Sequence, residues 1–155
     1  MTVLDLACGE GRHALKAAQW GATVTAVDQD DTKLEIGREA AERLGVTVDF
    51  QSVDLAGEWP EFGTFDMVLM FNYLDRPRVA DVKAAVAPNG VLLMETYLEW
   101  QRALGWGPNT DEHLLAPGEL TRLAAPFELL HGREVFEPIE STKVRAVASI
   151  AAQKR

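Results

Sequence analysis

The stretch that decides the fold lies at the beginning of the chain and reads Val3-Leu4-Asp5-Leu6-Ala7-Cys8-Gly9-Glu10-Gly11-Arg12-His13-Ala14. Its first half is apolar and suits a strand over residues 2–7, and residues 12–20 are predicted to form a helix. Between them, Gly9 and Gly11 lack a Cβ atom, so the backbone can turn sharply and approach a ligand closely. The free N–H groups at the start of the helix suit an anionic group of that ligand. Strand, glycine turn and helix in this order predict the cofactor site of a doubly wound α/β fold.

This turn is compatible with two kinds of cofactor. Residues 9–14 match the dinucleotide fingerprint G-x-G-x-x-G/A, which is a weak signal by itself. Asp5 favours a different ligand, because a dinucleotide-binding strand is usually apolar up to its glycines. A carboxylate beside an apolar core is costly without a partner. A ligand ammonium or N–H donors of the glycine loop would supply that partner; the alternative is that Asp5 only caps the turn.

Composition and charge limit the class of protein. The 155 residues are enough for one ordinary domain, so we expect residues 1–155 to form a single domain. The sequence has no apolar run of membrane-spanning length, no signal-peptide pattern, and one cysteine, Cys8, which predicts a cytoplasmic protein. The formal net charge is −9, and the only basic cluster is the terminal Lys154-Arg155, which reads as a solvated tail; a nucleic-acid partner is therefore disfavoured. We find no cluster with metal-ligand spacing and predict no metal.

The rest of the chain alternates predicted strands and helices. Further strands are predicted at residues 23–27, 46–53, 65–71, 91–95, 127–136 and 144–152, and further helices at 32–44, from Pro77 through Val79, Val82 and Val86, and at 117–124. Residues 88–90 are predicted to form a turn, and residues 103–116 are the least regular stretch. The strand at 144–152 is apolar on both faces apart from Arg145 and Ser149, which indicates an interior strand inserted late. The pattern predicts an α/β, Rossmann-like, mostly parallel sheet.

Asp28 stands at the end of the second predicted strand, about 20 residues after Gly9. An acidic residue at this distance can accept hydrogen bonds from the ribose hydroxyls of a bound nucleoside. Asp28 therefore indicates a nucleoside without choosing between the two cofactors. Helix capping is the alternative role for Asp28, but nearby Asp30, Asp31 and Thr32 already supply that chemistry.

The stretch Leu4-Asp5-Leu6-Ala7-Cys8-Gly9-Glu10-Gly11 resembles the first motif of class I S-adenosylmethionine-dependent methyltransferases. The resemblance extends to about Lys154 and includes the late strand, which in that family is antiparallel, so it implies the sheet order 3-2-1-4-5-7-6. Residues 71–77, 94–97 and 114–120 are similar to a bacterial subgroup close to the tellurite-resistance methyltransferases. The sequence departs from the family because it begins at its first strand, where we would expect one or two helices that cover the cofactor.

The resemblance implies S-adenosyl-L-methionine as the cofactor and S-adenosyl-L-homocysteine as its product. In such a site the glycine loop bends round the methionine part, with Asp5 nearby, and Asp28 holds the ribose. Asp54 accepts from the adenine amino group, and the N–H of Leu55 meets a ring nitrogen. The implied cofactor-contacting residues are Asp5, Ala7, Cys8, Gly9, Glu10, Gly11, Arg12, His13, Asp28, Gln29, Asp54, Leu55, Phe71 and Asn72, the last two near the transferred methyl group.

The predicted function is methyl transfer to a small-molecule acceptor. In-line displacement at a sulfonium methyl group needs alignment more than acid–base groups, so no catalytic residue is assigned. Where an acceptor must lose a proton, the unranked candidates are His13, Tyr73, Tyr97 and His113. The alternatives are an NAD-dependent oxidoreductase and a non-catalytic cofactor-binding subunit of a larger complex.

The loop at residues 97–116 leaves the fifth predicted strand beside the expected methyl position. Its Trp100 and Trp106 either line a pocket or anchor the loop. Because no helix precedes the first strand in this sequence, we expect this loop to act as a partial lid. Self-association into a homodimer is expected as an addition.

Overall fold

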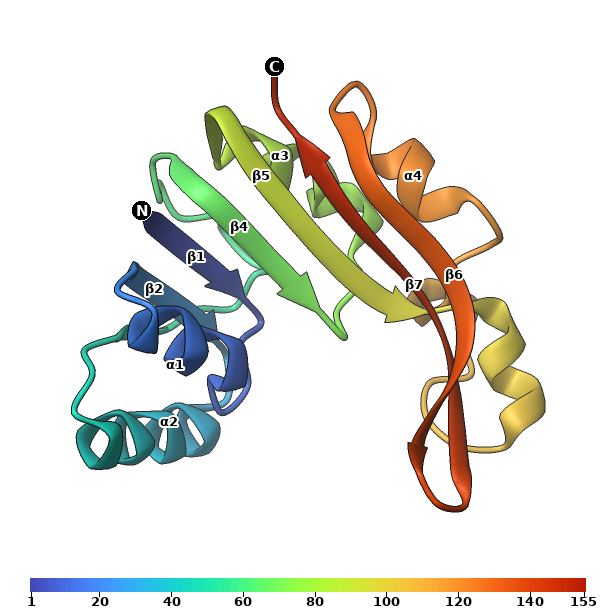
Figure 1. The fold of residues 1–155 in the computed structure, drawn as a ribbon, viewed down its shortest axis with the longest axis horizontal. Coiled ribbons are helices and arrows are strands. Elements are labelled where there is room, and N and C mark those ends of the chain that lie inside the picture. The colour runs from blue at the N-terminus through green and yellow to red at the C-terminus, as the bar shows by residue number, and fades with distance from the viewer.

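The computed structural model describes all of residues 1–155 and shows a seven-stranded sheet flanked by helices (Figure 1). The strands are β1 (Thr2–Leu6), β2 (Thr23–Asp28), β3 (Asp49–Ser52), β4 (Phe65–Phe71), β5 (Val86–Tyr97), β6 (Glu128–Glu140) and β7 (Lys143–Gln153). The helices are α1 (Arg12–Gln19), α2 (Asp31–Leu44), α3 (Val79–Ala84) and α4 (Glu119–Ala124), with 3-10 segments η1 (Arg76–Arg78), η2 (Glu99–Leu104) and η3 (Asp111–His113). None of the helices is long and apolar enough to cross a membrane.

The strand order is β3-β2-β1-β4-β5-β7-β6, as predicted. The first five strands run parallel, and β7 lies antiparallel between β5 and β6. The carboxyl ends of β1, β2, β3 and β4 therefore meet at one edge of the sheet. The chain order reverses between β1 and β4, which is where a doubly wound fold forms its ligand crevice.

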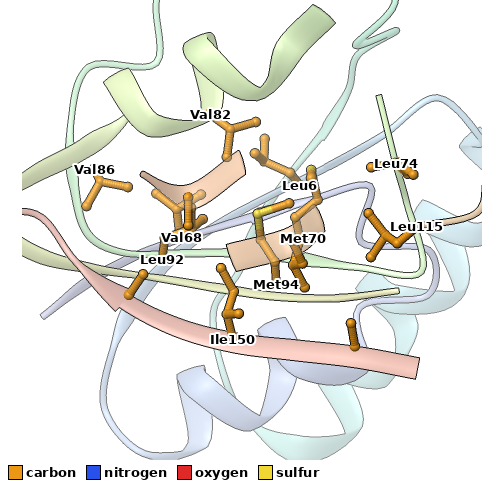
Figure 2. Packing of buried hydrophobic residues seen from close by; sticks show 14 of the residues in the cluster. Leu6, Val68, Met70, Leu74, Val82, Val86, Leu92, Met94, Leu115 and Ile150 are labelled. Carbon is orange, nitrogen blue, oxygen red and sulfur yellow. The ribbon is translucent and has the colours of Figure 1, made fainter. Parts of the chain in front are cut away.

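Two apolar clusters hold the helices against the two faces of the sheet. The larger cluster packs residues of the central strands against α3 and α4, and Figure 2 shows Leu6, Val68 and Met94 converging there with Val82 of α3. The smaller cluster lies under α1 and α2 and includes Phe50. In Figure 1 no helix lies in front of β4, β5 and β7, so that part of the sheet face is left uncovered.

Several predicted bounds are wrong. Val86 does not continue a helix but begins β5, where it is fully buried and pairs with Phe65. The spacing of Val86 from Val79 and Val82 matches the buried face of a helix, but a single apolar residue is equally compatible with a buried strand. The predicted turn at 88–90 is an irregularity within β5, with Asn89 at a φ of 64°. The third strand is shorter than predicted because β3 is an edge strand that pairs only with β2.

The stretch at 103–116 is more regular than predicted, since η2 and η3 occupy part of it. Its anchor is Gln101, a fully buried side chain. The Oε1 atom of Gln101 accepts from the N–H of Ala146 at 2.8 Å, and its Nε2 donates to the carbonyl of Trp106 at 3.0 Å. The indole N–H of Trp106 then donates to the carbonyl of Val144 at 3.0 Å. These bonds attach the beginning of the loop to β7.

Candidate cofactor-binding site

The glycine loop joins β1 to α1 through a series of left-handed residues. Ala7, Gly9 and Gly11 have φ values of 54°, 57° and 83°. A Cβ atom at Gly9 would meet nothing within 4 Å, whereas one at Gly11 would lie 2.8 Å from the ring of Phe50. Gly9 thus leaves open space beside the loop, and Gly11 lets the start of α1 pack closely against the aromatic ring.

A cleft of about 600 Å³ opens beside this loop, at the carboxyl ends of β1, β2 and β4. All the cofactor-contacting residues that the sequence predicts line it, except Gly11, Asp54 and Leu55. Asp54 and Leu55 line a smaller hollow of about 150 Å³, which shares Asp28 and Tyr73 with the cleft. The structure therefore brings these residues together along one continuous surface, with Gly11 behind it.

Sequence reasoning missed two residues of the cleft wall, Asp30 and Lys33. Asp30 is the N-cap of α2, and its Oδ1 accepts from the N–H of Lys33 at 3.1 Å. Both follow Asp28 within little more than one helical turn, so their proximity to an acid at the end of β2 was the available signal. Nowhere in the chain do three or more His, Cys, Asp or Glu side chains gather closely enough to hold a metal ion.

Asp5 is the most perturbed acid of the cleft. Its side chain is only 2% exposed, and its Oδ2 atom has no hydrogen-bond partner. The pKa of Asp5 is raised to about 7, mainly by burial; the backbone N–H of Ala14 opposes the shift, and the charge of Asp28 adds to it. A buried carboxylate oxygen without a partner is costly, and a ligand ammonium would offset that cost. The unpaired carboxylate oxygen of Asp5 therefore fits the ammonium of a methionine moiety as its hydrogen-bond acceptor.

Asp28 organises the loop in addition to any contact with a ribose. Its Oδ2 accepts from the N–H of Gly9 at 2.8 Å, and its Oδ1 accepts from the N–H of Asp30 at 2.9 Å. One carboxylate thus connects the glycine loop to the beginning of α2. Each of its oxygens has a further lone pair that can accept from a ligand hydroxyl.

Asp54 and Leu55 follow β3 at the far end of this surface. The Oδ1 of Asp54 accepts from the N–H of Ala56 at 3.0 Å, which fixes a tight turn. The side chain of Leu55 is buried in the larger apolar cluster. The turn therefore offers a carboxylate and backbone groups to a ligand, and not an apolar side chain.

His13 and Phe71 form the other border of the cleft. Their rings stack with centroids 4.1 Å apart and an interplanar angle of 25°. Burial lowers the pKa of His13, the charge of Arg12 lowers it further, and Glu95 opposes the shift. Beyond the stacked pair an apolar groove of about 580 Å³ runs along the uncovered sheet face, with Trp20 at its margin. The neutral form of the His13 ring is therefore favoured, at the boundary between a polar cleft and an apolar groove.

A third hollow continues from the cleft beyond the ends of β4 and β5. It measures about 270 Å³ and is lined by Asn72, Tyr73, Leu74, Thr96, Tyr97, Pro108 and His113. Asn72 and Tyr73 also line the cleft, so the two spaces adjoin. Three of the candidate proton acceptors, Tyr73, Tyr97 and His113, meet here, whereas His13 lies apart from them.

The loop at residues 97–116 supplies part of the wall of this third hollow. Its Trp106 packs edge-on against Tyr97, with ring centroids 6.2 Å apart. Trp100 instead lies beside Phe136 of β6 at 5.9 Å, and neither tryptophan lines the hollow. The two tryptophans anchor the loop, and the lining comes from other residues of it.

Comparison with known proteins gives this geometry a family. Residues 3–90 match a family model described as a methyltransferase domain. Over 164 aligned residues the chain is 29% identical to the ubiquinone biosynthesis O-methyltransferase of Methylocella silvestris, with 90% of this chain and 63% of that protein covered. The chain thus spans less than two thirds of the length of this curated relative.

Solved structures share the fold. The crystal structure of TehB from Haemophilus influenzae matches with a TM-score of 0.83 and 20% identity, covering 99% of this chain and 57% of that one. A SAM-dependent methyltransferase from Methanosarcina mazei matches with a TM-score of 0.79 and 20% identity, covering 99% and 92% of the two chains. The predicted family and fold are confirmed: the chain belongs to the methyltransferase-domain family, with the class I Rossmann-like sheet.

Proposed function

We propose that this chain binds S-adenosyl-L-methionine in the cleft and transfers its methyl group to a small-molecule acceptor. The observation that carries the proposal is the buried Asp5, whose Oδ2 has no partner within the protein. The match of residues 3–90 to a methyltransferase domain supports it. When bound, the cofactor supplies a methyl group activated by a sulfonium charge.

Different residues of the cleft hold different parts of the cofactor. Asp5 receives the ammonium of the methionine part, and the N–H groups of the glycine loop and the start of α1 suit its carboxylate. Asp28 holds the ribose hydroxyls, and the turn at Asp54 and Leu55 holds the adenine. Phe71 and Asn72, at the end of β4, lie at the methyl end.

The protein's contribution to the reaction is alignment. Displacement at a methyl carbon requires the acceptor atom to approach in line, and a preorganised site supplies most of that benefit. Asn72 has a φ of 56°, and its N–H donates to the carbonyl of Glu95 at 2.8 Å. This bond ties the end of β4 to β5, so the two strand ends that border the cleft and the third hollow are held in register.

An NAD-dependent oxidoreductase is the weaker alternative, because NAD has no ammonium to place beside Asp5 and the antiparallel β7 is not a usual part of that fold. A non-catalytic cofactor-binding subunit would leave the third hollow without a role.

The name of the Methylocella silvestris relative supports an oxygen atom as the methyl acceptor. The net charge of −9 supports a small acceptor over a nucleic acid.

We further propose that residues 1–155 act as one domain in the cytoplasm, away from membranes, with the single Cys8 free. The apolar groove bordered by Trp20, which is 79% exposed, supports association with a second copy. Sedimentation of the chain and of Trp20→Glu tests this: the substitution should shift the chain from dimer to monomer. A monomeric parent chain would exclude the dimer.

Methyl transfer tests the proposed function. The chain is incubated with cofactor labelled in the methyl group and with a panel of phenols, thiols, amines and small oxyanions. Label should appear in at least one small acceptor, and Asp5→Asn should reduce that transfer at subsaturating cofactor. Binding of cofactor without transfer to any acceptor would favour the non-catalytic subunit.

A further inference from the structure

A single guanidinium connects two stretches that the methyltransferase fold does not join by strand pairing. Arg76 follows β4 in η1, and Glu119 is the first residue of α4. The Nε and Nη2 atoms of Arg76 donate to Oε2 and Oε1 of Glu119 at 2.5 Å and 3.0 Å, so the pair is bidentate. Hydrogen bonds from Arg76 lower the pKa of Glu119. Both groups therefore stay charged at neutral pH.

The same guanidinium also holds the backbone around His113. Its Nη1 donates to the carbonyls of Asp111 and Glu112 at 3.0 Å and 3.4 Å, and its Nη2 donates to the carbonyl of Leu114 at 2.7 Å. These carbonyls lie on both sides of His113. An arginine fork that meets several carbonyls fixes backbone geometry far better than a flexible ammonium would.

Glu119 completes the arrangement from the other side. Besides binding Arg76, its Oε1 accepts from the N–H of Ala116 at 2.9 Å. The pair thus holds the chain before and after residue 114, and we call Arg76 and Glu119 the clasp. The clasp lies at the end of the loop opposite to Gln101, so both ends of the loop are anchored.

The held segment forms one wall of the third hollow. Pro108 and His113 stand there together with Tyr97 of β5, and Asn72 at the end of β4 joins this hollow to the cofactor cleft. An acceptor in the hollow would lie next to the methyl end of the cleft. The clasp therefore sets the distance between His113 and any acceptor.

The lining of the hollow indicates the kind of acceptor. Two tyrosines, a leucine and a proline supply most of it, and no lysine or arginine lines it. Its volume of about 270 Å³ lies below the range of roughly 300–1,000 Å³ usual for drug-sized ligands. A neutral acceptor with one aromatic ring fits these walls better than an oxyanion, which would have no cation to pair with.

We propose that Arg76 and Glu119 are positioning residues that fix the wall of an acceptor pocket, and that His113 in this wall accepts the proton of a one-ring phenol during its methylation. The inference rests on the proposed function. The Nε2 of His113 lies 3.4 Å from Oε1 of Glu112, and both side chains are largely exposed. The phenol oxygen bonds to the methyl carbon, the carbon–sulfur bond breaks with its electron pair left on sulfur, and the phenolic proton passes to the imidazole.

The role of His113 is tested with catechol as the acceptor and S-adenosylhomocysteine as the binding probe. His113→Gln should lower kcat for catechol by about a hundredfold or more, the usual contribution of general base catalysis. Its affinity for S-adenosylhomocysteine should stay within twofold of the parent. His131→Gln is the matched control, because His131 lies on the exposed strand β6. It should change neither quantity.

The clasp is tested with Arg76→Lys, which keeps the charge but loses the fork. Amide hydrogen exchange of residues 108–116 should accelerate. The fold-increase in KM for catechol should be roughly ten times the fold-change in affinity for S-adenosylhomocysteine. Arg38→Lys is the control, since Arg38 makes comparable bonds to Glu35 and to the carbonyl of Phe50 far from the hollow. If Arg76→Lys does not fold, Glu119→Gln replaces it, because the amide oxygen can still accept from Ala116.

The outcomes separate the inference from the proposed function. If the parent chain does not bind S-adenosylhomocysteine, the proposed function fails. If it binds that product but does not methylate catechol, the phenol assignment is wrong while the cofactor assignment stands. Normal turnover by His113→Gln would overturn the role of His113. Unchanged exchange and KM in Arg76→Lys, or in Glu119→Gln if that variant is used, would overturn the role of the clasp.

Discussion

Asp5→Asn should stabilise the folded chain and weaken cofactor binding, and the increase in the free energy of unfolding should depend on pH. The pKa of Asp5 is about 7 in the folded chain, against the ordinary aspartate value of 3.8 in the unfolded chain, and burial is the main cause of the difference. The pKa of Asp5 is higher in the folded chain than in the unfolded chain, so ionisation of Asp5 destabilises the fold. This loss of folding free energy is absent below about pH 4, grows as the pH rises, and levels off above pH 7. At about 1.4 kcal/mol per pKa unit the full cost is about 4 kcal/mol.

Most of this cost develops within a range that is easy to measure. Between pH 5 and pH 8 the ionisation of Asp5 should weaken the folded state by about 2.5 kcal/mol. Asparagine has nearly the same shape and does not ionise. The difference in unfolding free energy between Asp5→Asn and the parent should therefore be about 2.5 kcal/mol larger at pH 8 than at pH 5. Titrating groups that do not interact with Asp5 contribute equally to both chains and cancel.

Urea unfolding of both chains at the two pH values supplies the measurement. The variant should gain most at pH 8 and bind S-adenosylhomocysteine more weakly than the parent at the same pH. A stability difference that is the same at pH 5 and pH 8 would show that Asp5 ionises normally in the folded state and that burial does not raise its pKa. Glu10→Gln, on the exposed side of the same loop, is the control and should show no such pH dependence.

Three further substitutions follow from the geometry of the site. Gly11→Ala should destabilise the chain by about 1–3 kcal/mol in thermal or urea unfolding, because its Cβ would lie 2.8 Å from the Phe50 ring at a φ of 83°; unaltered stability would contradict the packing argument. Asp28→Ala should weaken S-adenosylhomocysteine binding by roughly tenfold to a hundredfold in calorimetry, since hydrogen bonds to a charged group contribute about 1.5–3 kcal/mol. An unchanged affinity would place the ribose elsewhere. Gln101→Ala should cost about 1–3 kcal/mol of stability, because it leaves a buried N–H of β7 without a partner; a cost near zero would mean that water replaces the amide.

The parts of this molecule that sequence reasoning could predict are local in the chain. We could predict the glycine loop, Asp5 and Asp28 because the strand, turn and helix are adjacent in sequence and follow known spacings. The full sheet order followed from the family resemblance and from the apolar pattern of β7. The bounds around Val86 failed because helical and strand periodicities coincide over so few apolar residues.

The clasp could not be predicted. Arg76 and Glu119 are separated by 43 residues, and neither has a neighbour that signals the pairing. The same holds for Gln101, whose partner on β7, Ala146, lies 45 residues away in the chain. Polar side chains that hold loops meet only after the sheet has formed, so their partners are a property of the fold and not of a motif. Gly11 shows the same limit, since its closeness to the ring of Phe50 in β3 arises only once the sheet has formed.

The central claim is that the cleft beside Asp5 is built for adenosylmethionine. Titration calorimetry of the parent chain with S-adenosylhomocysteine and with NAD tests it most directly. We expect one molecule of S-adenosylhomocysteine to bind per chain, with protons released near pH 7 as the ligand ammonium lowers the pKa of Asp5, and NAD not to bind. Binding of NAD without binding of S-adenosylhomocysteine would show that the cleft is not an adenosylmethionine site.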